Sequence, residues 1–204
     1  IDKQQVAATS SEVVLGEVSL ADAIVPTEHK NLSLVASTPH LANTEVDLAK
    51  VEGKFTRLQE AVNSVAEDYD YIIIDSPPSL SLLTVNGLIA ANYILRPVQA
   101  EFYALEGLGQ LLETMKLIRR GLNPGLELLG VVATMMDSRT TLSNQVHAEI
   151  KKHFQDAIFN TTIPRNIRLA EAPSHGLPIG AYDRFSKGAR AYKMLTKEII
   201  ERVK

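Results

Sequence analysis

The sequence has no cysteine and no tryptophan, and aromatic residues make up only 5% of its 204 positions. Without cysteine, neither a disulfide bond nor a thiolate metal site can form. The five histidines are scattered, and His147 and His153 are not spaced as a pair on one helical face, so a zinc or iron site is not expected. The chain also lacks a G-x-S-x-G elbow and an apolar run long enough to cross a bilayer. What remains is a globular chain with 45% hydrophobic residues, a composition that favours an α/β domain in the cytoplasm.

One stretch combines an apolar run with a carboxylate and prolines. Residues 71–74 read Tyr-Ile-Ile-Ile and are followed by Asp75, Ser76 and Pro77. An apolar run without alternation predicts a strand at 71–75 that is covered on both faces, with Asp75 at its carboxyl end. A carboxylate at that position can hold Mg²⁺ beside phosphate groups, often through water. The alternative is that Asp75 merely caps the helix that follows.

Strand-like and helix-like segments alternate along the chain. Strands are expected at 32–36, 71–75, 93–97, 128–134 and 157–163, and helices at 54–66, 82–91, 104–120, 142–154 and from 186 onward. This alternation predicts an α/β fold with a doubly wound, mostly parallel sheet and helices on both faces. No linker is visible, so residues 1–204 are expected to form a single domain.

Four polar segments each lie just past the carboxyl end of an expected strand. They contain Asp75, residues 99–101, residues 134–137 and residues 164–166. Because the carboxyl ends of parallel strands share one edge, these segments are expected to converge on one site.

Four segments of the chain resemble the ParA/Soj family of chromosome and plasmid partitioning ATPases. They are DYIIIDSPPSL at 70–80, PVQAEFYALEG at 97–107, TMMDSRT at 134–140 and IPRNIRLAEAPS at 163–174. The resemblance extends from about residue 32 to the end of the chain. It implies a deviant P-loop NTPase fold, ATP and Mg²⁺ as cofactors, and a homodimer when ATP is bound.

The resemblance also assigns roles to residues of the expected site. Asp75 is similar to the carboxylate that orients the Mg²⁺ shell through water and supports hydrolysis. Met135 and the segment Pro164-Arg165-Asn166 are similar to the part that contacts adenine, although ordinary packing would equally account for Met135 and Pro164. Gln99 and Glu101 stand at the edge of the nucleotide site. They face the partner subunit or cap the helix that begins near residue 103.

DNA is the second ligand that the resemblance implies. Arg139 and Arg168 occupy positions where similar proteins place arginines that touch DNA, and Lys187 and Arg190 could extend that surface or simply be solvated. All four lie in residues 139–204, which hold 12 Lys and Arg against 6 Asp and Glu. Contacts to phosphates would make binding to double-stranded DNA nonspecific and sensitive to salt. The rival explanation is that the arginines hold a loop through ion pairs with nearby acidic residues, Asp137 or Glu171.

The phosphate loop of the family is absent from residues 1–204, because no G-x-x-x-x-G-K-[ST] occurs in them. We therefore expect a chain truncated at its amino end, lacking the first strand-helix unit and inactive on its own. The complete protein is then a nucleotide-dependent switch on the nucleoid, stimulated by a centromere-binding partner of the ParB type. Two alternatives stay open: a MinD-like division-site ATPase that binds membrane, and a degenerate DNA-binding or dimerisation module without catalysis.

Overall fold

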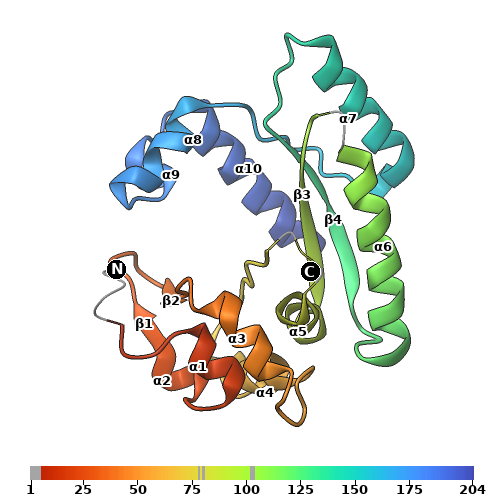
Figure 1. The fold of residues 1–204 in the computed structure, drawn as a ribbon. Coiled ribbons are helices and arrows are strands. Elements are labelled where there is room, and N and C mark those ends of the chain that lie inside the picture. The colour runs from red at the N-terminus through yellow and green to blue at the C-terminus, as the bar shows by residue number, and fades with distance from the viewer. Residues whose placement is uncertain (1–5, 78, 80, 102–103) are drawn as a thin grey trace. The chain divides into compact units, whose positions relative to one another are not determined.

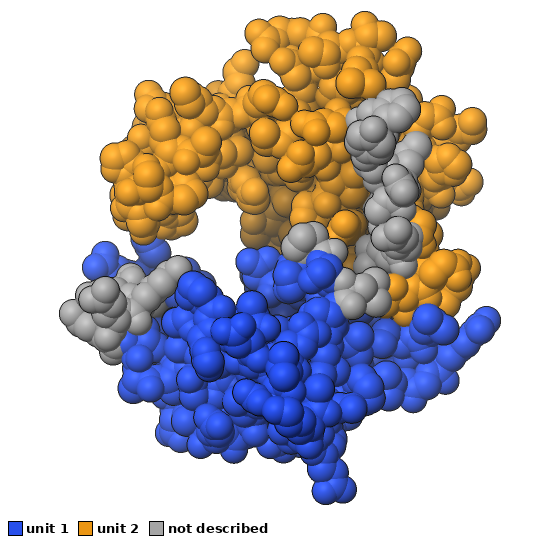
Figure 2. Space-filling view, viewed as in Figure 1, with its two compact units in different colours: residues 1–92, 117–126 blue, residues 93–116, 127–204 orange. Residues whose placement is uncertain are grey.

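The computed structural model describes residues 6–77, 79, 81–101 and 104–204. The chain divides into two compact units, one of residues 1–92 and 117–126 (unit 1) and one of residues 93–116 and 127–204 (unit 2) (Figures 1 and 2). Whether the chain behaves as the single domain expected from its sequence stays a prediction.

Unit 1 is built mainly from short helices. Its elements are α1 (Ser10–Leu15), α2 (Leu20–Ala23), β1 (Ile24–Pro26), β2 (Ser33–Val35), α3 (Leu41–Leu48), α4 (Arg57–Asn63), the 3₁₀ turn η2 (Ala66–Asp68) and α5 (Leu82–Ala90). The expected strand at 32–36 is present as β2, but it pairs antiparallel with β1 and not with a parallel neighbour. Val13, Leu20, Ala23 and Val65 form the centre of the apolar core.

A buried asparagine joins two helices of unit 1. The side chain of Asn86 in α5 is fully buried. Its amide group donates to the carbonyl oxygens of Lys54 (2.7 Å) and Leu82 (3.0 Å), and its Oδ1 accepts a hydrogen bond from the Leu58 N–H (3.2 Å). All of its hydrogen-bonding groups are therefore satisfied inside the unit, as a buried amide requires.

We expect Asn86→Ala to destabilise the protein by roughly 2 kcal/mol, because the partly buried Leu58 N–H and Lys54 carbonyl would lose their hydrogen-bond partner. Denaturant unfolding with Asn63→Ala as the control measures this cost, since Asn63 is an exposed asparagine at the end of α4. Equal midpoints for the two variants would contradict the role given to Asn86.

Unit 2 is a two-stranded parallel sheet covered by helices. It contains β3 (Tyr93–Gln99), β4 (Glu127–Thr134), α7 (Thr141–Phe154), η3 (Gln155–Ala157), α8 (Ile167–Glu171), η4 (Ala172–His175), α9 (Ile179–Tyr182) and α10 (Lys187–Arg202), while α6 (Ala104–Gly121) begins in unit 2 and ends in unit 1. β3 and β4 are parallel, with Tyr93 opposite Glu127 and Gln99 opposite Thr134. This confirms the α/β class and the parallel pairing of these two strands.

The two faces of the sheet are covered by different helices (Figure 1). Val131 of β4 packs with Val146 and Ile150 of α7, whereas the adjacent Val132 packs with Ala191 and Leu195 of α10. Successive side chains of a strand point to opposite faces, so these two clusters lie on opposite sides of β4. The amphipathic α10 thus docks onto the core of unit 2 through Ala191 and Leu195, while Tyr192 is 44% exposed. Every helix among the described residues is too short or too polar to span a membrane.

Two expected strands are wrong. Residues 71–75 contain no regular secondary structure, and residues 157–163 make only isolated bridges, of Ile158 to Val131 and of the following Pro164 to Met136. In the second segment the N–H groups of Phe159 and Ile163 do bond to β4, to the carbonyls of Val131 and Ala133. The intervening N–H groups of Asn160 and Thr161 donate instead to the carboxylate of Glu198, which interrupts the ladder.

Candidate functional site

Asp75 lies in unit 1 on an extended, exposed segment. Ile73 is 92% exposed, and no described strand pairs with residues 71–75. A strand is held by backbone hydrogen bonds to a neighbouring strand, so an apolar run that lacks such a neighbour does not form a strand. The segment instead runs along α5, where a Cβ built on Gly87 would lie 3.3 Å from the Ser76 hydroxyl and 3.5 Å from the Ile74 side chain.

The carboxylate of Asp75 does not cap the following helix. α5 begins at Leu82, and its cap is Ser81, whose hydroxyl accepts from the Thr84 N–H. Asp75 is thus an exposed carboxylate seven residues before the helix. No group of three metal-ligating side chains occurs in the described part of the chain. The role of Asp75 at a magnesium ion stays a prediction.

Three segments of unit 2 meet at the carboxyl edge of its parallel sheet. The Ala100 N–H donates to the Thr134 carbonyl (3.0 Å), which joins the ends of β3 and β4. The Met136 N–H donates to the Ile163 carbonyl and the Arg165 N–H to the Met136 carbonyl, both at 3.0 Å. Met135, Pro164 and Arg165 are thereby brought together, as the topology predicts. Asp75 belongs to unit 1.

The backbone at Met135 adopts an uncommon conformation. Its φ is +54°, in the left-handed region that a residue with a Cβ rarely occupies, and its side chain is 40% exposed. Such strain is concentrated at functional sites, where the surrounding structure holds it. Here the bonds of Met136 to residues 163 and 165 supply that restraint.

Asn166 caps a helix at the same edge. Its Oδ1 accepts from the Arg168 N–H (3.0 Å) and so begins α8. The amide oxygen of Asn166 thus serves the cap of α8, and the other polar group of its side chain is an NH₂ donor.

Gln99 and Glu101 stand at the end of β3, and one of them is joined to the next segment. Glu101 Oε1 lies 3.5 Å from Arg165 Nη2, an ion pair between side chains that are both more than half exposed. The sequence left open that Gln99 or Glu101 caps the next helix. That helix was expected to begin near residue 103, and residues 102–103 lie outside the described residues, so this alternative stays a prediction.

Arg139 is held by a neighbouring carboxylate. Its Nε donates to Asp137 Oδ1 (2.8 Å) and its Nη2 to Asp137 Oδ2 (2.7 Å), while the Arg139 side chain is 87% exposed. The hydrogen bonds from Arg139 lower the pKa of Asp137 to about 2. The ion pair that the sequence left as a rival explanation is therefore present.

Arg168 is held in the same way by two carboxylates. Its Nη1 donates to Glu171 Oε2 (2.9 Å), and its Nε lies 3.6 Å from Asp183 Oδ2. Tyr182 also donates to Glu171 Oε2 (3.1 Å). Hydrogen bonds from Arg168 and Tyr182 lower the pKa of Glu171. The sequence indicated Glu171 as a partner but gave no sign of Asp183, which lies fifteen residues away.

Lys187 and Arg190 line a cleft beside α10. The cleft has a volume of about 340 Å³ and is bounded on its other side by residues 160–162 and Pro164. Within the described residues, neither basic side chain has an ion-pair or hydrogen-bond partner. Their surroundings therefore differ from those of Arg139 and Arg168.

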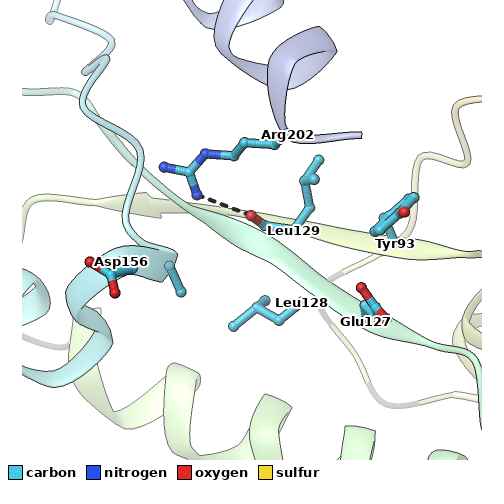
Figure 3. Close-up of a pocket in the computed structure, with 7 residues that line it drawn as sticks. Tyr93, Glu127, Leu128, Leu129, Asp156 and Arg202 are labelled. Atoms are coloured by element: carbon cyan, nitrogen blue, oxygen red, sulfur yellow. Dashed lines mark hydrogen bonds between the residues drawn. The ribbon is translucent and has the colours of Figure 1, made fainter. Parts of the chain in front are cut away.

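A second cavity, of about 280 Å³, lies at the opposite edge of the sheet (Figure 3). It includes Tyr93 and Glu127, the first residues of β3 and β4, with Arg202 above Leu129. Ligands of open parallel sheets bind at the carboxyl ends of the strands, so this cavity is not the candidate site.

The carboxyl edge of a parallel sheet with helices on both faces places the chain in the class of nucleotide-binding α/β proteins. A family model described as an AAA domain matches residues 1–128. The chain is 46% identical over 199 residues to the sporulation initiation inhibitor protein Soj of Bacillus subtilis, covering 98% of this chain and 79% of that protein. It is 43% identical over 202 residues to the chromosome partitioning protein ParA of Myxococcus xanthus, covering 99% and 71%.

A solved structure agrees with these relatives. Cobyrinic acid a,c-diamide synthase from Mycobacterium smegmatis, crystallised with an ATP analog and magnesium, superimposes with a TM-score of 0.83 at 32% identity, over 99% of this chain and 75% of that one. The chain belongs to the Soj/ParA family of chromosome-partitioning ATPases. This confirms the family that the four sequence segments indicated.

Proposed function

We propose that this protein is an ATP-driven dimerisation switch that binds double-stranded DNA without sequence preference during chromosome or plasmid segregation. A partner of the ParB type stimulates hydrolysis and release, and the protein acts in the cytoplasm on the nucleoid. Family membership supports the ATPase part of this proposal. The observation that carries it is the meeting of residues 99–101, 134–136 and 163–166 at one edge of a parallel sheet.

ATP with Mg²⁺ is the cofactor that the edge suits. Met135 and Pro164 offer apolar surface for the adenine ring, and the NH₂ group of Asn166 offers a donor to the base. Arg165, oriented by Glu101, stands beside them. Gln99 and Glu101 face the second subunit of the ATP-bound dimer. Bound Mg²⁺ would neutralise charge on the phosphates, and Asp75 would orient its water shell.

DNA binding is assigned to basic residues of unit 2. Arg139, Arg168, Lys187 and Arg190 can donate to phosphate oxygens, which carry no sequence information. Binding through such contacts weakens steeply as salt is added, because counterions are released from the DNA.

The ion pair of Arg139 allows a direct test of the DNA role. Arg139→Ala should weaken the binding of unrelated duplexes equally, by roughly threefold to tenfold, and should lower the log–log salt slope by about one for each phosphate that is no longer neutralised. Asp137→Asn keeps the guanidinium and removes a negative charge, so it should preserve or strengthen DNA binding. Filter binding across a salt series on the ATP-bound full-length protein measures both.

The rival explanation gives a different pattern. If Arg139 only holds the loop at 137–140, both substitutions break the same ion pair and should weaken ATP binding and DNA binding together. A joint loss in both variants, with an unchanged salt slope, would eliminate the direct contact.

A further inference from the structure

Asn166 lies between two anchors. On its amino side, the Arg165 N–H donates to the carbonyl of Met136 at the sheet edge (3.0 Å). On its carboxyl side, its Oδ1 accepts from the Arg168 N–H and begins α8. α8 has only five residues, and a helix this short gains little stability from its own hydrogen bonds. The orientation of Asn166 therefore depends on the contacts that hold α8 in place.

One of these contacts is close apolar packing between α8 and α10. Leu169 of α8 packs against a cluster of buried residues that includes Ile163 and Leu195. A Cβ built on Gly188 of α10 would lie 2.6 Å from Leu169 Cγ, so this approach requires a glycine. The packing fixes how near α8 lies to α10, but apolar contact has no direction of its own. The rotation of α8 needs polar contacts in addition.

The end of the neighbouring helix α9 supplies such polar contacts (Figure 1). Glu171, the last residue of α8, accepts from the hydroxyl of Tyr182 (3.1 Å) and from Arg168 (2.9 Å). Asp183, directly after α9, lies 3.6 Å from the Nε of Arg168. His175 stacks on the ring of Tyr182, with the ring centroids 4.9 Å apart, and so restrains the direction of its hydroxyl. Residues 182–183 therefore hold α8 both near its beginning and at its end.

We propose that Tyr182 and Asp183 are positioning residues of the nucleotide site. Through the two charged side chains of α8 they fix the rotation of that helix, and with it the direction in which Asn166 presents its NH₂ group to the base. Both act only through α8. This inference rests on the proposed contact of Asn166 with the base and names the residues that hold it in place.

The test compares the binding of ATP with that of inorganic triphosphate, which has no base, by calorimetric titration of the full-length protein with Mg²⁺. Tyr182→Phe removes only the hydroxyl, so it should weaken ATP binding by roughly threefold and leave triphosphate binding unchanged. Asp183→Asn should act in the same direction, because the amide keeps the shape of the carboxylate and loses its charge. Tyr192→Phe is the matched control, because Tyr192 is an exposed tyrosine of α10. It should change either dissociation constant by less than about twofold.

Asn166→Ser separates the inference from the base contact on which it rests, because serine keeps an oxygen that caps α8 and removes the NH₂ donor. It should weaken ATP binding more than Tyr182→Phe does and spare triphosphate binding. If Asn166→Ser leaves ATP binding unchanged, the base contact is wrong and the inference falls with it. If Asn166→Ser weakens ATP binding but Tyr182→Phe behaves like Tyr192→Phe, the base contact stands and the positioning role is wrong. Equal losses of ATP and triphosphate binding in Tyr182→Phe would show a general loss of structure and would also overturn the positioning role.

Discussion

Asp75→Ala is expected to reduce ATP hydrolysis by the full-length protein by about 100-fold or more, through loss of the carboxylate that orients the Mg²⁺ shell and its water. The side chain is exposed and caps no helix, because α5 is capped by Ser81. The melting temperature should therefore stay within about 1 °C of wild type, as for an exposed position. Steady-state phosphate release beside a thermal melt measures both quantities.

Asp70→Ala is the matched control for this prediction. Asp70 is an exposed carboxylate five residues earlier in the chain, and its loss should leave hydrolysis unchanged. Unchanged turnover of Asp75→Ala together with a lowered melting temperature would show that Asp75 has a structural role and not a catalytic one.

The sequence predicts those elements whose signals lie within their own residues. β3, β4, α7 and α10 all occur close to their expected bounds, because their periodicity and their turn residues act locally. The grouping of Met135, Pro164 and Arg165 also follows from the strand order, although the hydrogen bonds of Met136 that join them are visible only in the structure.

The incorrectly predicted segments depend on partners far away in sequence. Residues 71–75 have the composition of a buried strand, but composition does not supply a neighbour to pair with, and Ile73 is exposed. At residues 157–163 the competing acceptor is Glu198, about 38 positions further on. A glutamate four residues before an arginine on a helix face is also the ordinary pattern of a surface ion pair, so the pattern gave no sign of the role of Glu198 and Arg202.

The pairing of Arg139 and Arg168 with carboxylates changes how the basic third of the chain is interpreted. Counting charges predicts a positive surface but cannot tell an available cation from one already neutralised. Both arginines are already neutralised: Arg139 pairs with Asp137, and Arg168 pairs with Glu171 and Asp183. Lys187 and Arg190 have no ion-pair partner among the described residues, and for these two the sequence left simple solvation open.

Arg202→Ala is expected to destabilise the protein by roughly 3 kcal/mol. The Arg202 guanidinium donates to the carbonyl oxygen of Leu129 (Figure 3) and to that of Ile158. It also pairs with Glu198 and lies 3.9 Å from the centre of the Phe159 ring. Its removal leaves the half-buried carboxylate of Glu198 without its cationic partner and two carbonyls without their donor. Urea unfolding at neutral pH measures the loss.

The acid dependence of stability distinguishes this network from simple packing. Burial raises the pKa of Glu198, but the hydrogen bonds from the N–H groups of Asn160 and Thr161 outweigh it, and the pKa is lowered. A carboxyl group whose pKa is lower in the folded than in the unfolded state adds stability at pH values above the ordinary pKa of glutamate. This stability is lost as the pH falls through the lowered pKa of the folded state. Glu198→Gln should therefore weaken the decline of stability in acid.

Arg184→Ala is the control for Arg202→Ala, because Arg184 also lies over a phenylalanine ring, that of Phe185, at 4.6 Å, but at an exposed position. It should cost less than about 0.5 kcal/mol. In the double variant with Glu198→Gln, the cost of Arg202→Ala should shrink, since the charge that it neutralises is gone. Equal costs for Arg184→Ala and Arg202→Ala, or strict additivity with Glu198→Gln, would show that the ring contact and not the Glu198 network accounts for the stabilisation.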